Sequence, residues 1–206
     1  MRCLALDTET TGLPSRSPAG TVRIMQLGFV VCDITPAGVS IVHEYDQLLR
    51  LPPGTAVDPV AERIHGISRE QCEAGGVEVA DAIMELTRWV VPPSPGGAPV
   101  TVVGHSIDFD FGIIAQEARR LGLEHSLRAL GVATSYCTME KGTQVCRLPR
   151  PNALPGFKYP KLTELFSHLF PGEPVPPKTH SAIVDAHLAL RCYLAMEHPA
   201  PRFLPK

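Results

Sequence analysis

Residues 4–13 read Leu4-Ala5-Leu6-Asp7-Thr8-Glu9-Thr10-Thr11-Gly12-Leu13, an apolar strand that carries two acids and then breaks at a glycine. Alternate residues of a β-strand point to the same face of a sheet, so Asp7 and Glu9 project together. Two neighbouring carboxylates raise each other's pKa, and a divalent cation bound between them relieves the repulsion. The stretch therefore predicts half of a metal site, although an ordinary strand with acids near its end shows the same pattern.

The length and charge of the chain limit the classes of protein to consider. A chain of 206 residues fits one domain, which buries roughly 70% of its unfolded surface. We expect a single domain over residues 1–198 and a disordered tail over residues 199–206. The formal net charge is −2, but if four carboxylates belong to a metal site, the remaining residues carry +2. Weak acidity therefore does not exclude a nucleic-acid partner.

The cysteines and the hydrophobic segments indicate a soluble, intracellular protein. The six cysteines form no C-x-x-C pair and no Cys/His cluster at zinc spacing, which favours reduced thiols. The N-terminus has no basic region followed by an apolar core, and the longest nearly apolar stretch, residues 24–31, is too short to span a bilayer. We expect a cytoplasmic or nuclear location and no membrane partner.

Hydrophobic periodicity and turn residues predict an α/β domain. Residues 22–31 are typical of a central strand, and residues 39–51 are expected to return beside it across a turn at 35–38. The later predictions are short helical turns at 58–68, a helix from 79, a crossover loop at 92–99, a buried strand at 100–105, a helix beginning at 109 and closed at 122, an edge strand at 136–139, a short helix at 162–170 and a long helix at 182–196.

Two further acids and a histidine occur where predicted elements begin. Asp110 opens the helix after strand 100–105, Asp185 lies early in the last helix, and His180 precedes it by five residues. Two cations that clamp the attacking and leaving oxygens of a phosphodiester need such anionic ligands. Oxygen ligands favour Mg²⁺ or Mn²⁺ over Zn²⁺, and a histidine titrates in the range of a general base. The pattern predicts a site for two Mg²⁺ or Mn²⁺ ions.

Three segments resemble, in order, the motifs of the DEDDh branch of 3′–5′ exonucleases, which includes polymerase proofreading subunits and RNase T. These are residues 7–13, 104–110 and 180–185, and residues 64–68 and 160–165 are similar to secondary blocks of the family. The order and spacing of the segments over almost the whole chain make the resemblance specific.

The resemblance implies a fold and a set of roles. The implied fold is RNase H-like, an α/β fold with a central mixed five-stranded sheet, an antiparallel hairpin and flanking helices. The implied metal ligands are carboxylates that also serve as catalytic residues, and the implied base deprotonates the attacking water. The ligands are Asp7, Glu9, Asp110 and Asp185, and the base is His180. A tyrosine-type variant would carry Tyr where Ser181 stands, so the sequence resembles the histidine branch.

The second motif departs from the family pattern at one position and carries one additional acid. Ser106 replaces a common asparagine, which implies looser contacts with the terminal nucleotide. We interpret Asp108 as an exposed helix-capping residue rather than as a metal ligand.

Several residues are candidates for contact with the 3′-terminal nucleotide. Leu13 either wedges against the terminal base or packs within its loop, and His65 either contacts the substrate or is structural. Backbone groups of the tight turn can face the nucleotide because glycine allows close approach. The full set of predicted substrate contacts is Thr10, Thr11, Gly12, Leu13, His65 and Phe109. Residues 141–161 hold five cations and no acid, and this segment either follows phosphates or is a solvated loop.

The sequence predicts a metal-dependent enzyme that releases nucleoside 5′-monophosphates from the 3′ end of single-stranded DNA, in proofreading or repair. One alternative is a 3′–5′ exoribonuclease, because recognition of the 2′-OH cannot be deduced from sequence. Another is a non-catalytic subunit that retains the fold and binds a polymerase or nucleic acid, and the enzyme itself is expected to have a polymerase or repair partner. The intact set of mutually repelling acids argues against this second alternative, because a binding module has no need of them.

Overall fold

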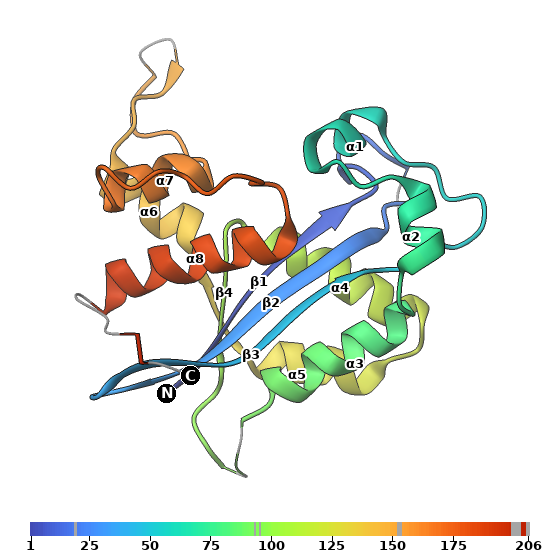
Figure 1. Ribbon diagram of the computed structural model, residues 1–206, viewed down its shortest axis with the longest axis horizontal. Helices are drawn as coiled ribbons and strands as arrows, with labels where there is room; N and C mark the ends of the chain where they lie inside the picture. Colours follow the sequence, from blue (N-terminus) through green and yellow to red (C-terminus); the bar gives the residue numbers. More distant parts are fainter. Residues whose placement is uncertain (19, 93, 95, 152–153, 199–202, 205–206) are drawn as a thin grey trace.

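The computed structural model describes the whole chain except residues 19, 93, 95, 152–153, 199–202 and 205–206 (Figure 1). A five-stranded sheet runs through its centre in the order β3-β2-β1-β4-β5. β1 is antiparallel to β2 and parallel to β4, which makes the sheet mixed, as predicted. The strands are β1 (Arg2–Thr10), β2 (Ile24–Thr35), β3 (Gly38–Leu48), β4 (Thr101–Gly104) and β5 (Thr134–Cys137).

The central strand β1 is buried on both faces, and its side chains alternate between two cores. Leu4 and Leu6 pack in one core, whereas Cys3 and Ala5 pack in the other. The same alternation continues beyond the apolar run. Asp7 and Glu9 therefore point to the face of Cys3 and Ala5, where the last helix lies.

Helices cover both faces of the sheet (Figure 1). The core that contains Leu4 and Leu6 is closed by α3 (Val79–Val90), α4 (Ile107–Arg120) and α5 (Glu124–Val132). The core that contains Cys3 and Ala5 is closed chiefly by α7 (Leu162–Leu169) and α8 (Ala182–Glu197), and α6 (Thr138–Cys146) lies beside them. Two short helices, α1 (Pro59–His65) and α2 (Arg69–Gly75), lie near the end of β1 that carries the acids.

Three helices were not predicted, namely α2, α5 and α6. α6 has glycine and threonine in its interior, which are weak helix formers. It forms because it packs on α7: a Cβ atom at Gly142 would lie 2.8 Å from the Leu165 side chain. Tertiary packing therefore decides this helix, and packing is not visible in local sequence.

The start of α4 also differs from the prediction. The helix begins at Ile107 rather than Phe109, and its N-cap is Ser106, at a left-handed φ of 76°. Asp108 lies in the first turn and is exposed. Its predicted exposure is confirmed, but its predicted capping role is wrong, because the helix starts two residues earlier.

The C-terminal residues that the structure describes contact the sheet. Phe203 forms a parallel bridge with Val39, and the backbone N–H of Leu204 donates to the Val39 carbonyl at 2.8 Å. The rest of the predicted tail, residues 199–202 and 205–206, lies outside the described residues. None of the helices in the described part of the chain has the length and hydrophobicity needed to cross a membrane.

Candidate active site

The structure brings the predicted acids and the histidine together at one end of the sheet. Ligand atoms of Glu9, His180 and Asp185 all lie within 4.8 Å of one another. Asp7 is close enough to the other acids to feel their charge: burial raises its pKa well above the usual range, and repulsion from Asp110, Glu9 and Asp185 raises it further. We call these five residues the acid cluster.

The carboxylates of the acid cluster are destabilised as anions. Burial, with repulsion from Asp185 and Asp110, raises the pKa of Glu9 to about 8. Burial also raises the pKa of Asp110 to about 7, although the Thr8 hydroxyl donates to Asp110 Oδ1 at 2.7 Å and opposes that rise. Such a group of carboxylates is stabilised by a bound cation.

Asp185 offers a specific test of whether a cation fits. Its Oδ2 accepts a hydrogen bond from the backbone N–H of His180 at 3.1 Å. His180 has a left-handed φ of 69°, which is uncommon for a residue other than glycine. Asp185 Oδ1 is buried and has no hydrogen-bond partner among the described residues. An unpartnered buried oxygen beside other carboxylates fits a hard divalent cation such as Mg²⁺ or Mn²⁺.

Two residues of β2 position the start of α8, and sequence reasoning missed both. A Cβ atom at Gly28 would collide with the backbone of Ala182 and Ile183, so only glycine permits this close approach. The Gln26 side chain accepts from the Ala182 N–H at 3.0 Å and donates to Asp46 Oδ1 at 2.7 Å. The sequence does carry a signal for these two positions, because a glycine and a glutamine are unusual inside an otherwise apolar strand.

A cavity of about 370 Å³ lies on one side of the acid cluster, and we call it the terminal pocket. Its wall includes Leu13, whose side chain is 46% exposed. His65 Nδ1 accepts from the Ile67 N–H at 3.0 Å, while its Nε2 is buried without a partner among the described residues. Of the predicted substrate contacts, the pocket is lined by Thr10, Gly12, Leu13, His65 and Phe109.

Thr11 is the one predicted substrate contact that does not line the terminal pocket. Its backbone N–H donates to the Arg23 carbonyl at 2.9 Å, and its carbonyl accepts from the Asp58 N–H at 2.8 Å. Its hydroxyl accepts from the Arg23 N–H at 3.0 Å. The hydrogen-bonding groups of Thr11 are therefore engaged within the protein.

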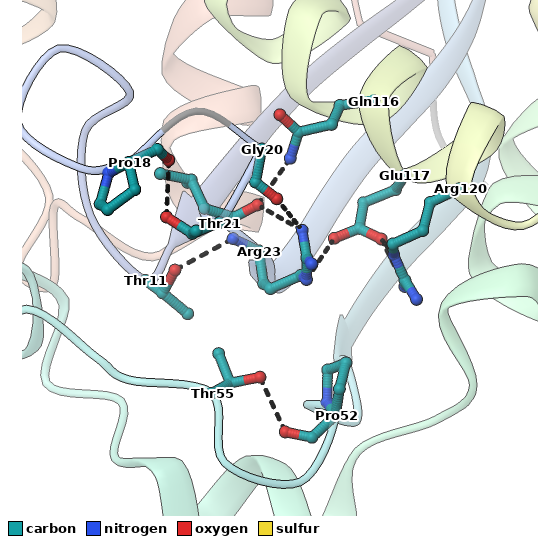
Figure 2. A network of polar contacts seen from close by, with 11 residues as sticks. Thr11, Pro18, Gly20, Thr21, Arg23, Pro52, Thr55, Gln116, Glu117 and Arg120 are labelled. Atoms are coloured by element: carbon teal, nitrogen blue, oxygen red, sulfur yellow. Dashed lines mark hydrogen bonds and ion pairs between the residues drawn. The ribbon is translucent and has the colours of Figure 1, made fainter.

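A polar network holds the loop between β1 and β2 against α4 (Figure 2). Glu117 is fully buried; its Oε2 accepts from Arg120 at 2.6 and 2.8 Å, and its Oε1 lies 3.7 Å from Arg23 Nε. Arg23 in turn donates to the Gly20 carbonyl at 2.7 Å, and Gln116 donates to the Val22 carbonyl at 2.8 Å. The network links the helix that carries Asp110 to the loop that follows Leu13.

A larger cavity, of about 730 Å³, lies on the other side of the acid cluster, and we call it the second groove. Its lining includes Asp7, His180 and Asp185 of the acid cluster and residues 159–163. Ile64, 52% exposed, lines both the second groove and the terminal pocket. The acid cluster therefore lies between two cavities.

The fold is similar to those of two solved exonuclease structures. E. coli Exonuclease I in complex with a dT13 oligonucleotide matches with a TM-score of 0.66 at 16% sequence identity. The match covers 96% of this chain but 42% of Exonuclease I, so this chain spans less than half of that protein. A 3′-exonuclease that recognises a histone mRNA stem-loop matches with a TM-score of 0.64 at 14% identity, over 95% of this chain and 63% of that one. At such identities, the likeness establishes the RNase H-like fold alone.

The family follows from the sequence itself. No curated protein matches the sequence significantly. A family model, RNase_T, described as an exonuclease, matches residues 4–193, which is nearly the whole chain. The chain therefore belongs to the RNase_T exonuclease family, the DEDDh-type 3′–5′ exonucleases that its sequence motifs resemble.

Proposed function

We propose that this chain is a metal-dependent 3′–5′ exonuclease that releases nucleoside 5′-monophosphates from single-stranded DNA. The observation that carries the proposal is the acid cluster between two cavities. A phosphodiester at the cluster has a nucleoside on each side, and each cavity offers room for one of them. The proposed metal ligands are Asp7, Glu9, Asp110 and Asp185.

The proposed mechanism assigns a proton acceptor and a direction of cleavage. Two divalent cations supply, at such sites, acidification of the attacking water and neutralisation of charge on the phosphate. His180 is exposed and its ring lies beside Glu9 and Asp185, where it can take the proton of the water. Water adds to phosphorus and the bond from phosphorus to the 3′-oxygen breaks, so the terminal nucleotide leaves with its 5′-phosphate.

The choice of DNA over RNA has weaker support than the chemistry. Exonuclease I binds dT13 and dA16 oligonucleotides, whereas the related 3′-exonuclease recognises the 3′ end of an RNA stem-loop. RNA is therefore the second candidate substrate. A role in proofreading or repair, with a polymerase or repair partner, stays a prediction.

The proposal is tested with DNA and RNA oligonucleotides of matched sequence, labelled at the 5′ end. With Mg²⁺ or Mn²⁺ we expect a ladder of products shortened from the 3′ end of DNA, and no ladder in chelator. Asp110→Asn should be inactive, whereas Asp108→Ala, which changes an exposed acid in the same helical turn, should keep most activity. Undiminished cleavage in chelator would contradict the metal mechanism. A ladder on RNA alone would show that the substrate is RNA rather than DNA.

A further inference from the structure

A cavity of about 590 Å³ lies between two loops outside the acid cluster, and we call it the loop cavity. One of the loops joins β1 to β2, and the other contains residues 52–58. Figure 2 shows Thr11 and Arg23 of the first loop across an open space from Pro52 and Thr55 of the second.

Contacts between the two loops separate the loop cavity from the terminal pocket. The Asp58 N–H donates to the Thr11 carbonyl at 2.8 Å. A Cβ atom at Gly12 would lie 3.3 Å from Asp58 Cβ and 3.3 Å from the Ser17 hydroxyl oxygen. Arg16 and Asp58 line both cavities, but none of the five residues of the acid cluster lines the loop cavity. The loop cavity is therefore a neighbour of the terminal pocket and not part of the site of hydrolysis.

The loop cavity carries more positive charge than the terminal pocket. Its lining includes Arg16 and Arg23 against one acid, Asp58. The lining of the terminal pocket includes Glu9 and Asp58 against Arg16. In the absence of metal ions, an anion is therefore favoured in the loop cavity over the terminal pocket.

Arg23 is held in position with part of its guanidinium group unused. Its Nη1 donates to the carbonyl oxygens of Gly20 at 2.7 Å and Val22 at 3.2 Å. Its Nε lies 3.7 Å from Glu117 Oε1, which is beyond hydrogen-bond distance. Arg120 already donates to the other oxygen of that carboxylate at 2.6 and 2.8 Å. Arg23 therefore keeps donors and positive charge for a ligand.

Two other side chains of the same loop offer donors to the loop cavity. Arg16 is exposed, and its side chain forms no hydrogen bond or ion pair with another described residue. The hydroxyl group of Ser17 likewise forms no hydrogen bond with a described residue. Arginine and hydroxyl donors are common partners of phosphate oxygens. The lining therefore suits a phosphate group.

The loop cavity is larger than a phosphate group alone requires. Its volume of about 590 Å³ lies within the range of about 300–1,000 Å³ that is usual for small-molecule sites. The second loop contributes the apolar residues Pro52, Pro53, Ala56 and Val57 to the lining. Proline has a fixed φ, so such a wall loses little conformational entropy when a ligand packs on it. The cavity therefore suits a phosphate ester that also carries a less polar group.

We propose that the loop cavity binds a nucleoside 5′-monophosphate, with its phosphate group between Arg16 and Arg23 and its nucleoside against residues 52–57. The site goes beyond the proposed function, because it takes no part in hydrolysis. Only the identification of this nucleotide as the product of the reaction rests on that function, which would release it in the adjacent terminal pocket.

The class of ligand is tested by calorimetric titration of the protein in chelator with thymidine 5′-monophosphate, inorganic phosphate and thymidine. Without metal ions, the mutually repelling carboxylates disfavour a phosphate at the acid cluster. The monophosphate should bind at least about tenfold more tightly than inorganic phosphate, because the nucleoside buries apolar surface. Thymidine should not bind measurably.

Each of the other outcomes removes part of the assignment. Equal affinity for inorganic phosphate and the monophosphate would overturn the nucleoside contact. Equal affinity for thymidine and the monophosphate would overturn the phosphate contact. Absence of binding by the monophosphate would overturn the site.

Two variants locate the bound nucleotide. Ala56→Glu adds a carboxylate at an exposed position that lines the loop cavity and not the terminal pocket. It should weaken binding of the monophosphate by about tenfold or more. Leu13→Ala changes the terminal pocket and not the loop cavity, and it should leave this affinity unchanged. The reverse pattern would place the nucleotide in the terminal pocket and overturn the proposal.

The phosphate contact is tested by Arg16→Ala, which should weaken binding of the monophosphate by roughly 10- to 100-fold, the usual worth of a charge-assisted hydrogen bond. Arg63→Ala removes an exposed arginine of α1 that lines neither cavity, and it should bind as the wild type does. Equal affinity of Arg16→Ala and wild type would overturn the position assigned to the phosphate.

These titrations involve no hydrolysis, so the inference and the proposed function fail in different ways. Hydrolysis of oligonucleotides by the wild type, combined with no binding of the monophosphate in chelator, would overturn the loop cavity alone. Binding that Ala56→Glu weakens, without hydrolysis by the wild type, would support the site and overturn the proposed function.

Discussion

At the scale of single residues, repulsion between the carboxylates of the acid cluster destabilises the metal-free protein. Asp7 repels three other acids in the fold, and unfolding relieves that repulsion. We expect Asp7→Asn to melt at a higher temperature than the wild type in chelator. With Mn²⁺ the order should reverse, because a ligand bound only to the native state stabilises it by about 2.7 kcal/mol at a hundredfold excess over Kd.

Four thermal melts decide this prediction, one for each protein with chelator and with Mn²⁺. The wild type should gain much more from Mn²⁺ than Asp7→Asn. If the substitution lowers the melting temperature in chelator and leaves the Mn²⁺ shift unchanged, Asp7 does not share a metal site with the other acids.

The raised pKa values predict how the stability of the metal-free protein depends on pH. Glu9 has a pKa of about 8 and Asp110 of about 7 in the fold, against ordinary values of 4.5 and 3.8. Between these limits the folded state binds more protons than the unfolded state, so the free energy of unfolding falls as pH rises. In chelator, we expect a lower melting temperature at pH 8 than at pH 6. A higher one would mean that these acids are not destabilised as anions.

His180 is predicted to act on the reaction rather than on folding. Because its ring is exposed, His180→Ala should leave the melting temperature in chelator nearly unchanged. Loss of a positioned general base should lower kcat by roughly 10²- to 10⁴-fold. Steady-state kinetics with saturating Mn²⁺ measure this effect, and an unchanged kcat would assign proton transfer to another group.

At the scale of elements, the approach of α8 to β2 decides where Asp185 lies. Gly28→Ala places a Cβ atom against the backbone of Ala182 and Ile183, and overpacking of this kind costs about 1–3 kcal/mol. We expect lower stability in urea and weaker Mn²⁺ binding. Gly112→Ala is the matched control, because a Cβ atom there meets nothing within 4 Å. That change in α4 should stabilise the protein by up to about 1 kcal/mol.

Comparison of the two glycine variants separates packing from glycine replacement in general. If Gly28→Ala is as stable as the wild type and binds Mn²⁺ equally well, the close approach of α8 is not required for the site. If both variants lose stability, the loss does not report on the position of α8.

Some of the helices and strands could be predicted from the sequence and others could not. β1, the hairpin of β2 and β3, and α8 have apolar runs or turn signals that local sequence displays. α6 has no such signal, because Gly142 and Thr143 disfavour a helix, and its tertiary packing, which includes the contact of Gly142 with Leu165, explains it. Gln26 was missed because its bond to the Ala182 N–H joins residues 156 positions apart.

At the scale of the whole molecule, the acid cluster is assembled from distant parts of the chain. The order of the sequence motifs predicted which residues belong to the cluster, because metal-dependent hydrolysis needs carboxylates and a proton acceptor. The two cavities that flank the cluster could not be predicted, because their walls come from segments that meet only in the fold. Residues within 58–65 and the turn after β1 line the terminal pocket. Residues 159–163, which include the first residues of α7, line the second groove.

The two cavities also predict the polarity of digestion. The terminal pocket has a volume of about 370 Å³ and is lined by Leu13 and His65, whereas the second groove has a volume of about 730 Å³ and is lined by residues 159–163. A phosphate added to the 3′ end would have to enter a pocket that is lined by two acids, Glu9 and Asp58, against one arginine, Arg16, and that lies beside the other mutually repelling acids. A 5′ phosphate lies at the far end of the strand.

We therefore expect an oligonucleotide with a 3′-phosphate to resist digestion and one with a 5′-phosphate to be digested at the normal rate. The measurement compares initial rates on the two phosphorylated oligonucleotides and on an unmodified strand of the same sequence. A phosphatase treatment of the 3′-phosphorylated strand is the control, since it should restore the full rate. Equal rates on both phosphorylated strands would show that the 3′ end does not enter the terminal pocket, and resistance of the 5′-phosphorylated strand alone would reverse the assigned polarity.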